Sequence, residues 1–182
     1  MVPADEVCCE ELRMQEVMIS IRPEWCRKII SGEKTLEIRK NRPDCDLPFK
    51  CYIYCTKKDG GLYLYGRQLS GFVVGEFVCD SVEEFGVPYP AWQKDLPAKF
   101  VVNSCLSYYD LHRYALISND CNLFAWHIKD LKLYEDGVQV NNFLNRNGDV
   151  LKRAPQNWCY CIQYHSCRFA TKDTILAEGS TE

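Results

Sequence analysis

Three polar side chains, Thr35, Glu37 and Arg39, stand at alternate positions directly after Lys34. In an extended strand, alternate residues share a face and lie about 6.5 Å apart, so the segment presents a hydroxyl, a carboxylate and a guanidinium in a row. A carboxylate can accept hydrogen bonds or move a proton, and lysine and arginine bind phosphate groups. The pattern therefore predicts a site for an anionic ligand or a site for acid–base chemistry.

The residues alone leave two interpretations of this face open. An ordinary solvated face with a surface ion pair between Glu37 and Arg39 would contribute about 0–1 kcal/mol to stability. The local charge favours a functional face. Residues 27–42, which include Lys40, hold six Lys and Arg against two Glu, a net charge of +4 on a chain whose net charge is −3. Such a concentrated basic patch indicates an anionic or phosphate-bearing partner.

The elements that position these residues follow from the apolar pattern around them. Pro23 suits the first turn of a helix, and Gly32 suits the left-handed residue that ends one. Apolar residues recur between them at helical spacing, which predicts a short amphipathic helix. After Gly32 the period changes to two, so Leu36 and Ile38 are predicted to be the core residues of a strand.

The rest of the chain reads mainly as strands. The pattern predicts strands over residues 17–21, 50–56, 71–80, 123–134 and 157–164. Ser107 followed by Asp110 has the form of a capping box and predicts a short helix over 108–116. Strands joined by short helices predict a mainly β fold of the α+β class in one compact, barrel-like domain. A doubly wound parallel fold is disfavoured, because long helices do not alternate with the strands.

Composition limits the environment of the protein. The chain has 182 residues, of which 47% are hydrophobic, enough for the core of one domain. No stretch approaches the roughly 18 apolar residues that cross a bilayer, and the acidic N-terminus lacks an apolar signal core. These features predict a cytoplasmic protein without a membrane partner.

The twelve cysteines are interpreted as small hydrophobic residues with free thiols. Cys51 and Cys55, and likewise Cys159 and Cys161, alternate with other residues at strand spacing. No Cys-x-x-Cys pair occurs, so no metal site and no cofactor are predicted. The alternative is a zinc ion held by one of two sets: Cys45, Cys51 and Cys55, or Cys159, Cys161, His165 and Cys167.

Four residues elsewhere are further candidates for ligand binding. Tyr54, Trp126 and Trp158 offer aromatic faces on which a base could stack, and core packing is the alternative for each of them. Glu76 stands inside an apolar strand, where a carboxylate must face solvent or be paired, and the solvated position is predicted.

Six ordered blocks of the sequence resemble the ASCH domain family, in its phage and gut-bacterial branch. The central block has the form Gly-x-Lys-x-x-Glu-x-Arg and runs from Gly32 to Arg39. The others lie at residues 19–24, 52–56, 74–77, 124–128 and 153–160, so the resemblance covers roughly 17–164. It implies a pseudo-β-barrel similar to the PUA fold. The predicted organisation is a polar extension over 1–16, an ASCH-like domain over 17–164 with a variable surface excursion at 135–153, and a tail over 165–182.

The resemblance also implies functions. The family is associated with RNA or nucleotide binding, so the predicted function is a binding module with a basic cleft formed by Lys34, Thr35, Glu37, Arg39 and Lys40. The alternative is a hydrolase, because family members include a small amidohydrolase acting on acetylated cytidine and proposed ribonucleases. In that case Lys34 would be the base, and Glu37 would position water or shuttle a proton. The amidohydrolase has a threonine at the position of Glu37, and a carboxylate there would act as base or binder, not as nucleophile.

Overall fold

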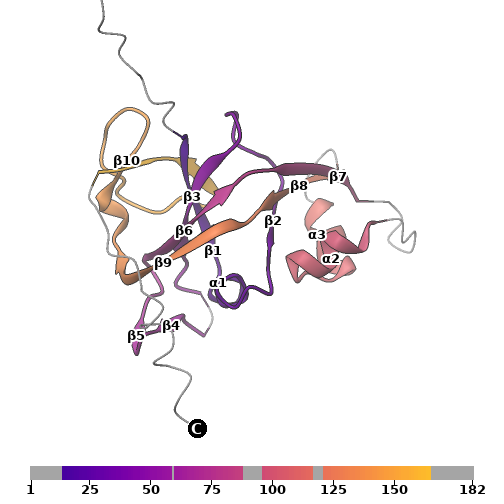
Figure 1. Cartoon of the computed structure of the whole chain (residues 1–182), viewed down its shortest axis with the longest axis horizontal. Coiled ribbons are helices and arrows are strands. Elements are labelled where there is room, and N and C mark those ends of the chain that lie inside the picture. The colour runs from indigo at the N-terminus through magenta and orange to yellow at the C-terminus, as the bar shows by residue number, and fades with distance from the viewer. Residues whose placement is uncertain (1–13, 59, 88–95, 117–120, 165–182) are drawn as a thin grey trace, which may run out of the picture.

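The computed structural model describes residues 14–58, 60–87, 96–116 and 121–164. Its largest element is a five-stranded sheet with the spatial order β11 (Trp158–Tyr160), β1 (Glu16–Ile21), β3 (Phe49–Cys55), β6 (Val73–Cys79) and β9 (Lys129–Val138). Strands β1 and β3 run parallel, and the other neighbours pair antiparallel. Figure 1 shows this sheet at the centre of the molecule.

Helix α1 (Pro23–Ile30) and the strand after it form as the sequence predicts. Pro23 begins the helix, and Gly32 has a φ of +78°, a left-handed conformation that glycine adopts without steric cost. Cys26 and Ile29 bury the apolar stripe of the helix in the core cluster that contains residues of β1 and β3. The chain then enters β2 (Leu36–Arg39).

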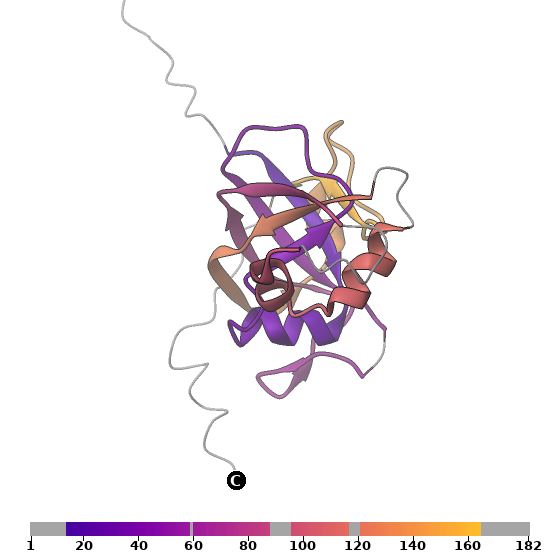
Figure 2. The same cartoon turned by 90° about the vertical axis from the view of Figure 1, so that its right-hand side faces the viewer.

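Strand β2 belongs to a second, three-stranded sheet. It pairs antiparallel with β8 (Asn122–His127), which pairs with β7 (Val82–Gly86). Helices α2 (Ala98–Ser104) and α3 (Tyr108–Ala115) pack on this sheet through an apolar cluster that includes Leu36, Ile38, Phe100 and Leu111. The predicted core role of Leu36 and Ile38 is confirmed. Figure 1 shows the helices beside this sheet, and in Figure 2 they face the viewer.

Two small sheets complete the described strands. The hairpin β4 (Tyr63–Leu64) and β5 (Arg67–Gln68) stands in the glycine-rich segment. After the short helix η1 (Val140–Asn142), β10 (Phe143–Leu144) pairs with β12 (Ile162–Gln163). The prediction of a mainly β fold with short helices is confirmed. The described sheets do not close into a barrel, so the pseudo-barrel stays a prediction. No helix in the described ranges is long and apolar enough to cross a membrane.

Two predicted strands are each divided in the structure. The segment predicted as one strand over 123–134 consists of β8 and β9, which lie in different sheets. Ile128 separates them, and Asp130 has a φ of +49° where the chain changes sheets. The segment 157–164 is likewise divided into β11 and β12 at Cys161. Alternating apolar residues continue through both breaks because each half buries one face, so the pattern does not mark the change of sheet.

The cysteines among the described residues are free thiols. Cys51, Cys55 and Cys79 lie in the main core cluster. Burial raises the pKa of Cys51 and holds that of Cys79 at about 12, so these thiols stay protonated. Within the described residues no three His, Cys, Asp or Glu gather in a way that could hold a metal ion. His165 and Cys167, part of the second alternative zinc set, lie outside those residues.

Glu76 corrects a prediction. Its side chain is buried on β6 and not solvated. Oε2 accepts a hydrogen bond of 2.9 Å from the Tyr134 hydroxyl, and Oε1 lies 3.6 Å from Lys50 Nζ. The central place of β6 between β3 and β9 excludes water from the carboxylate, so the charge is compensated by neighbouring side chains.

Candidate functional site

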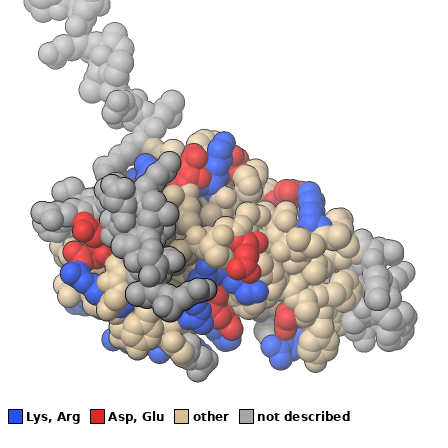
Figure 3. Space-filling view, turned by 60° about the horizontal axis from the view of Figure 1, so that its bottom comes forward, with Lys and Arg blue, Asp and Glu red and all other residues tan. Residues whose placement is uncertain are grey.

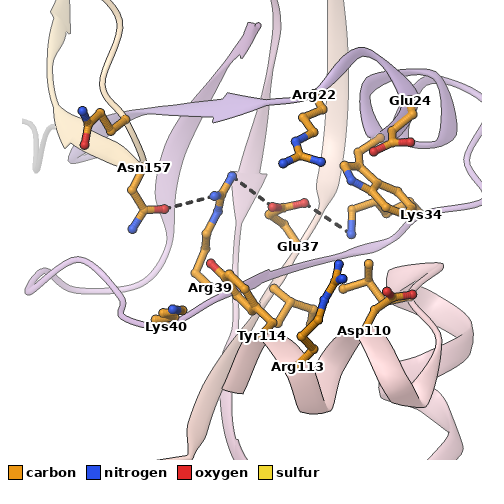
Figure 4. A pocket seen from close by; sticks show the side chains of 14 residues that line it. Arg22, Glu24, Lys34, Glu37, Arg39, Lys40, Asp110, Arg113, Tyr114 and Asn157 are labelled. Atoms are coloured by element: carbon orange, nitrogen blue, oxygen red, sulfur yellow. Dashed lines mark hydrogen bonds and ion pairs between the residues drawn. The ribbon is translucent and has the colours of Figure 1, made fainter. Parts of the chain in front are cut away.

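A pocket of about 940 Å³ opens between α1, β2 and α3. We call it the basic pocket, because its lining holds five basic side chains and three acidic ones, a net charge of +2. Four stretches of the chain supply the lining, as Figure 4 shows: Arg22, Glu24 and Trp25; Lys34, Glu37, Ile38, Arg39 and Lys40; Leu106, Asp110, Arg113 and Tyr114; Gln156 and Asn157.

The floor of the basic pocket is a buried ion network centred on Glu37. Glu37 Oε1 lies 3.0 Å from Arg39 Nη2, and Oε2 lies 3.3 Å from Lys34 Nζ. Glu37 is 7% exposed and Lys34 3% exposed, so the face that carries them is not an ordinary solvated strand face. No hydrogen bond from a described residue reaches Glu37 Oε2. Since buried carboxylate oxygens normally have hydrogen-bond donors, this oxygen has capacity left for one more.

The two cations beside Glu37 are themselves fixed. Lys34 Nζ donates hydrogen bonds of 2.8 Å to the carbonyl oxygens of Leu36 and Ser104. Arg39 donates to Asn157 Oδ1 at 3.0 Å and to the carbonyl oxygen of Ser20 at 2.9 Å. These bonds join β2 to α2, to β1 and to the segment before β11. The network therefore holds Glu37 rigidly at the contact between the two large sheets.

Two other arginines are held differently. Arg22, at the N-terminus of α1, and Arg113, on α3, are exposed, and their guanidinium groups have no hydrogen-bond or ion-pair partner among the described residues. Figure 4 shows their guanidinium groups reaching into the pocket from opposite sides. An unpaired guanidinium presents N–H donors in a planar fork that matches a phosphate group. Two of them across one pocket form a clamp for an anion.

Aromatic rings of Trp25 and Tyr114 also line the basic pocket. Both side chains are half-buried, and lysines lie close to them: Lys34 Nζ is 5.5 Å from the Trp25 ring centroid, and Lys40 Nζ is 4.9 Å from that of Tyr114. Burial raises the pKa of the Tyr114 phenol, while the positive charge of Arg39 acts in the opposite direction. Tyr114 is therefore a neutral ring with a hydroxyl donor at ordinary pH.

The predicted capping box holds α3 in place. Ser107 Oγ accepts a hydrogen bond of 3.1 Å from the Asp110 amide, and Asp110 Oδ2 accepts one of 3.3 Å from the Ser107 amide. This pair begins the helix that carries Arg113 and Tyr114. Asp110 thus lines the pocket and also fixes one of its walls.

The predicted binding residues separate into groups. Lys34, Glu37, Arg39 and Lys40 line the basic pocket together. Thr35 is next to it on the chain but is not part of the lining, and its backbone N–H and C=O pair with Asn103 and Ile128. The remaining four predicted residues, Tyr54, Glu76, Trp126 and Trp158, lie outside this pocket.

The predicted aromatic platforms lie elsewhere for physical reasons. Trp126 is fully buried, with its ring centroid 5.3 Å from that of Phe49 and 6.1 Å from that of Trp158, so it is a core residue. Trp158 is half-buried, and its Nε1 donates to Asn41 Oδ1 at 2.8 Å. Tyr54 lines a different pocket.

Sequence reasoning missed Arg22, Trp25, Arg113, Tyr114 and Asn157 as site residues. Trp25 falls at helical spacing with the apolar residues of the first helix, a position typical of core packing. Arg113 and Tyr114 follow the capping box, but nothing local indicates that their helix packs beside β2. The available signal is an arginine and an aromatic residue within or next to each of these two helices, and it is weak without the tertiary contacts.

Comparison with known proteins adds the family. The family model described as "ASCH domain" matches residues 19–136. No curated protein matches the chain. A crystal structure of an ASCH protein from Zymomonas mobilis is similar to this structure with a TM-score of 0.56 and 19% identity, covering 91% of this chain and 94% of that one. Crystal structures of a tyrosine-to-phenylalanine and a serine-to-alanine variant from the same organism have TM-scores of 0.55 and 0.57, at 18% and 19% identity. They cover 91% of this chain and 97% and 95% of their own.

These structures share the fold of this chain, and the family match spans the strands and helices that form the basic pocket up to β9. The family match supports a nucleic-acid-binding module. The chain belongs to the ASCH domain family.

Proposed function

We propose that this chain binds single-stranded RNA or a nucleotide in the basic pocket. The observation that carries the proposal is the pair Arg22 and Arg113, two exposed guanidinium groups that reach into one pocket without a partner among the described residues. On the face drawn in Figure 3, basic and acidic side chains are interspersed, and the chain as a whole has a net charge of −3. The affinity for an anion would therefore come from this pocket and not from a general charge excess.

The other lining groups suit the remaining parts of a nucleotide. Trp25 and Tyr114 offer ring faces on which a base can stack, a contact that tolerates any base. Glu37 has an oxygen without a hydrogen-bond donor, which suits an amino or hydroxyl group of a base or sugar. Lys34 and Arg39 hold the Glu37 carboxylate, and Lys40 adds positive charge at the pocket edge.

The test is a binding titration with a fluorescein-labelled oligouridine, followed by anisotropy from about 50 mM to about 200 mM salt. Wild type is expected to bind with an affinity that falls with salt. The double variant Arg22→Ala, Arg113→Ala is expected to lose about a hundredfold or more, because charged hydrogen bonds contribute about 1.5–3 kcal/mol each. Lys99→Ala, Lys129→Ala is the charge-matched control, since both lysines are exposed and line neither pocket. Equal losses in the two variants would remove the proposal.

The hydrolase alternative has one observation in its favour, a buried carboxylate with an open hydrogen-bond position at the floor of a pocket. Its predicted base, Lys34, has two carbonyl acceptors and Glu37 around Nζ, an arrangement that suits a fixed ammonium better than a base. Incubation of RNA and of an acylated cytidine with wild type and with Lys34→Met decides between the functions. We expect no turnover with either protein. Turnover by wild type that disappears in a folded Lys34→Met would establish the enzyme.

Further predictions concern the domain limits, the closure of the barrel, the family branch and the location of the protein. We propose a domain over 17–164 with the excursion at 135–153, between an extension over 1–16 and a tail over 165–182. Closure into a pseudo-barrel, membership of the phage and gut-bacterial branch and a cytoplasmic location also stay predictions. Limited proteolysis tests the domain limits, because cleavage is expected near the ends of 17–164 and not inside the sheets.

A further inference from the structure

A second pocket, of about 720 Å³, lies beside the hairpin β4–β5 and η1. We define it by its basic residues, Lys57, Lys152 and Arg153, together with Tyr54 and Phe72 and the amide side chains of Gln68, Gln139 and Asn141. Among the residues that the structure describes, its lining contains no Asp or Glu. A concave surface with three cations, two aromatic rings and neutral amides has the composition of a nucleic-acid site.

The three cations of the second pocket are available to a ligand. Lys57, Lys152 and Arg153 are exposed, and none has an ion-pair or hydrogen-bond partner among the described residues. Arg67 nearby on β5 differs, because it forms an ion pair with Asp136. The stem of Lys57 lies directly over Gly71, where an added Cβ would push the flexible lysine side chain aside. Unneutralised positive charge in a hollow concentrates anions.

The two pockets adjoin along one short segment of chain. Ala154 lines the second pocket and Gln156 lines the basic pocket, so their Cα atoms are at most about 7.6 Å apart. The segment between them is fixed, because Ser20 Oγ donates a hydrogen bond of 2.5 Å to the carbonyl oxygen of Pro155. Asn157, next along, accepts the hydrogen bond from Arg39. With a rise of about 3.4 Å per nucleotide in a stacked strand, about two nucleotides bridge this gap.

We propose that an RNA strand held in the basic pocket continues across the segment 154–156 into the second pocket, where Lys57, Lys152 and Arg153 bind its backbone phosphates. This inference rests on the proposed function, since it assigns the continuation of the same ligand. Tyr54 and Phe72 then offer further ring surfaces for bases, and the amides of the second pocket offer donors and acceptors. The basic pocket holds one or two nucleotides, and the second pocket extends the footprint.

The experiment compares a short and a long labelled oligouridine, of about two and about eight nucleotides. It uses wild type, the basic-pocket variant Arg22→Ala, Arg113→Ala, the second-pocket variant Lys152→Ala, Arg153→Ala and the control Lys99→Ala, Lys129→Ala. Wild type is expected to bind the long RNA at least tenfold more tightly than the short one. The second-pocket variant is expected to lose about tenfold for the long RNA, and for the short one no more than the control loses. Its salt slope with the long RNA is expected to fall by about 0.7 for each phosphate contact removed.

The outcomes separate this inference from the proposed function. If the short RNA binds through Arg22 and Arg113 but added length gives no gain, or the second-pocket variant matches the control, the inference is overturned and the proposed function stands. If the long RNA depends on Lys152 and Arg153 alone, the second pocket binds RNA independently and the proposed function fails. If wild type binds neither RNA, both fail. The substituted residues are exposed, and circular dichroism with thermal unfolding verifies that every variant folds.

Discussion

The floor of the basic pocket and the second pocket hold their charges in opposite ways, although the basic pocket also carries the exposed Arg22 and Arg113 at its sides. In the basic pocket, Glu37 is buried between Lys34 and Arg39, and each of these cations is also bonded to backbone or side-chain oxygens of other elements. In the second pocket the cations are exposed and unpaired among the described residues. A buried, cross-linked charge has a fixed position and suits discrimination between ligands, whereas exposed lysines supply attraction that depends on salt. Under the proposed function, the basic pocket would recognise the ligand and the second pocket would add affinity for longer RNA.

The largest difference between the two pockets is expected when the carboxylate at the floor of the basic pocket is removed. Glu37→Ala is expected to lower the free energy of unfolding by about 3–5 kcal/mol, because it leaves Arg39 and Lys34 buried without their counter-charge. Lys152→Ala, Arg153→Ala in the second pocket is expected to change it by no more than about 0.5 kcal/mol. Urea unfolding of the two variants measures both. A Glu37→Ala loss below about 1 kcal/mol would mean that the network is not a rigid floor.

The next largest effect is expected from removing an aromatic ring, which compares base stacking in the two pockets. Trp25→Ala is expected to weaken binding of a short oligouridine by about 1–3 kcal/mol, the effect of losing one stacked base. Trp25→Phe keeps a ring and is expected to retain most of the affinity. Tyr54→Leu in the second pocket is expected to leave the short RNA bound as in wild type. Fluorescence anisotropy measures the affinity of all three variants for the short RNA. Equal losses in Trp25→Ala and Tyr54→Leu would show that the short RNA does not bind preferentially in the basic pocket.

A smaller effect is expected from the wall that α3 provides. Ser107→Ala removes the capping box and is expected to cost about 0.5–2 kcal/mol of stability, while Ser107→Asn retains a capping acceptor and is expected to cost less. Because Arg113 and Tyr114 are on this helix, the short RNA is also expected to bind more weakly to Ser107→Ala. The gain in affinity from added length, which depends on the second pocket, is expected to stay as in wild type. Urea unfolding and the length series test the two halves of this prediction.

The smallest effect is expected from pH. Burial raises the pKa of Tyr114 in the basic pocket and of Tyr54 in the second, above the ordinary value of about 10. The folded state therefore favours the neutral phenol. This stabilisation is complete below the unfolded pKa and is lost as the pH rises through the raised one. RNA affinity is expected to show no tyrosine step between about pH 7 and about pH 9. The ultraviolet absorbance of ionised tyrosine, compared between wild type and Tyr114→Phe, locates the titration; a step below pH 10 would contradict the burial of that phenol.

The amino-acid sequence by itself determined the local elements and the class of the fold. Proline at 23, glycine at 32 and the Ser107–Asp110 box act on neighbouring backbone groups, so α1, its end and the start of α3 could be predicted from spacing. The alternation of Leu36 and Ile38 was equally local. The resemblance in ordered blocks led to the ASCH family, which the family model confirms.

Only the tertiary structure decided which side chains share a pocket and which are buried. Glu37 is largely buried because β2 pairs with β8, which places Trp126 directly opposite it, and Glu76 is buried because β6 is a central strand. Arg22, Arg113 and Asn157 come from three distant parts of the chain and meet only after both sheets have formed. Such meetings depend on long-range pairing and on how helices pack against strands. A local sequence pattern predicts neither the strand pairing nor the helix packing, because its period indicates only which face of its own element is apolar.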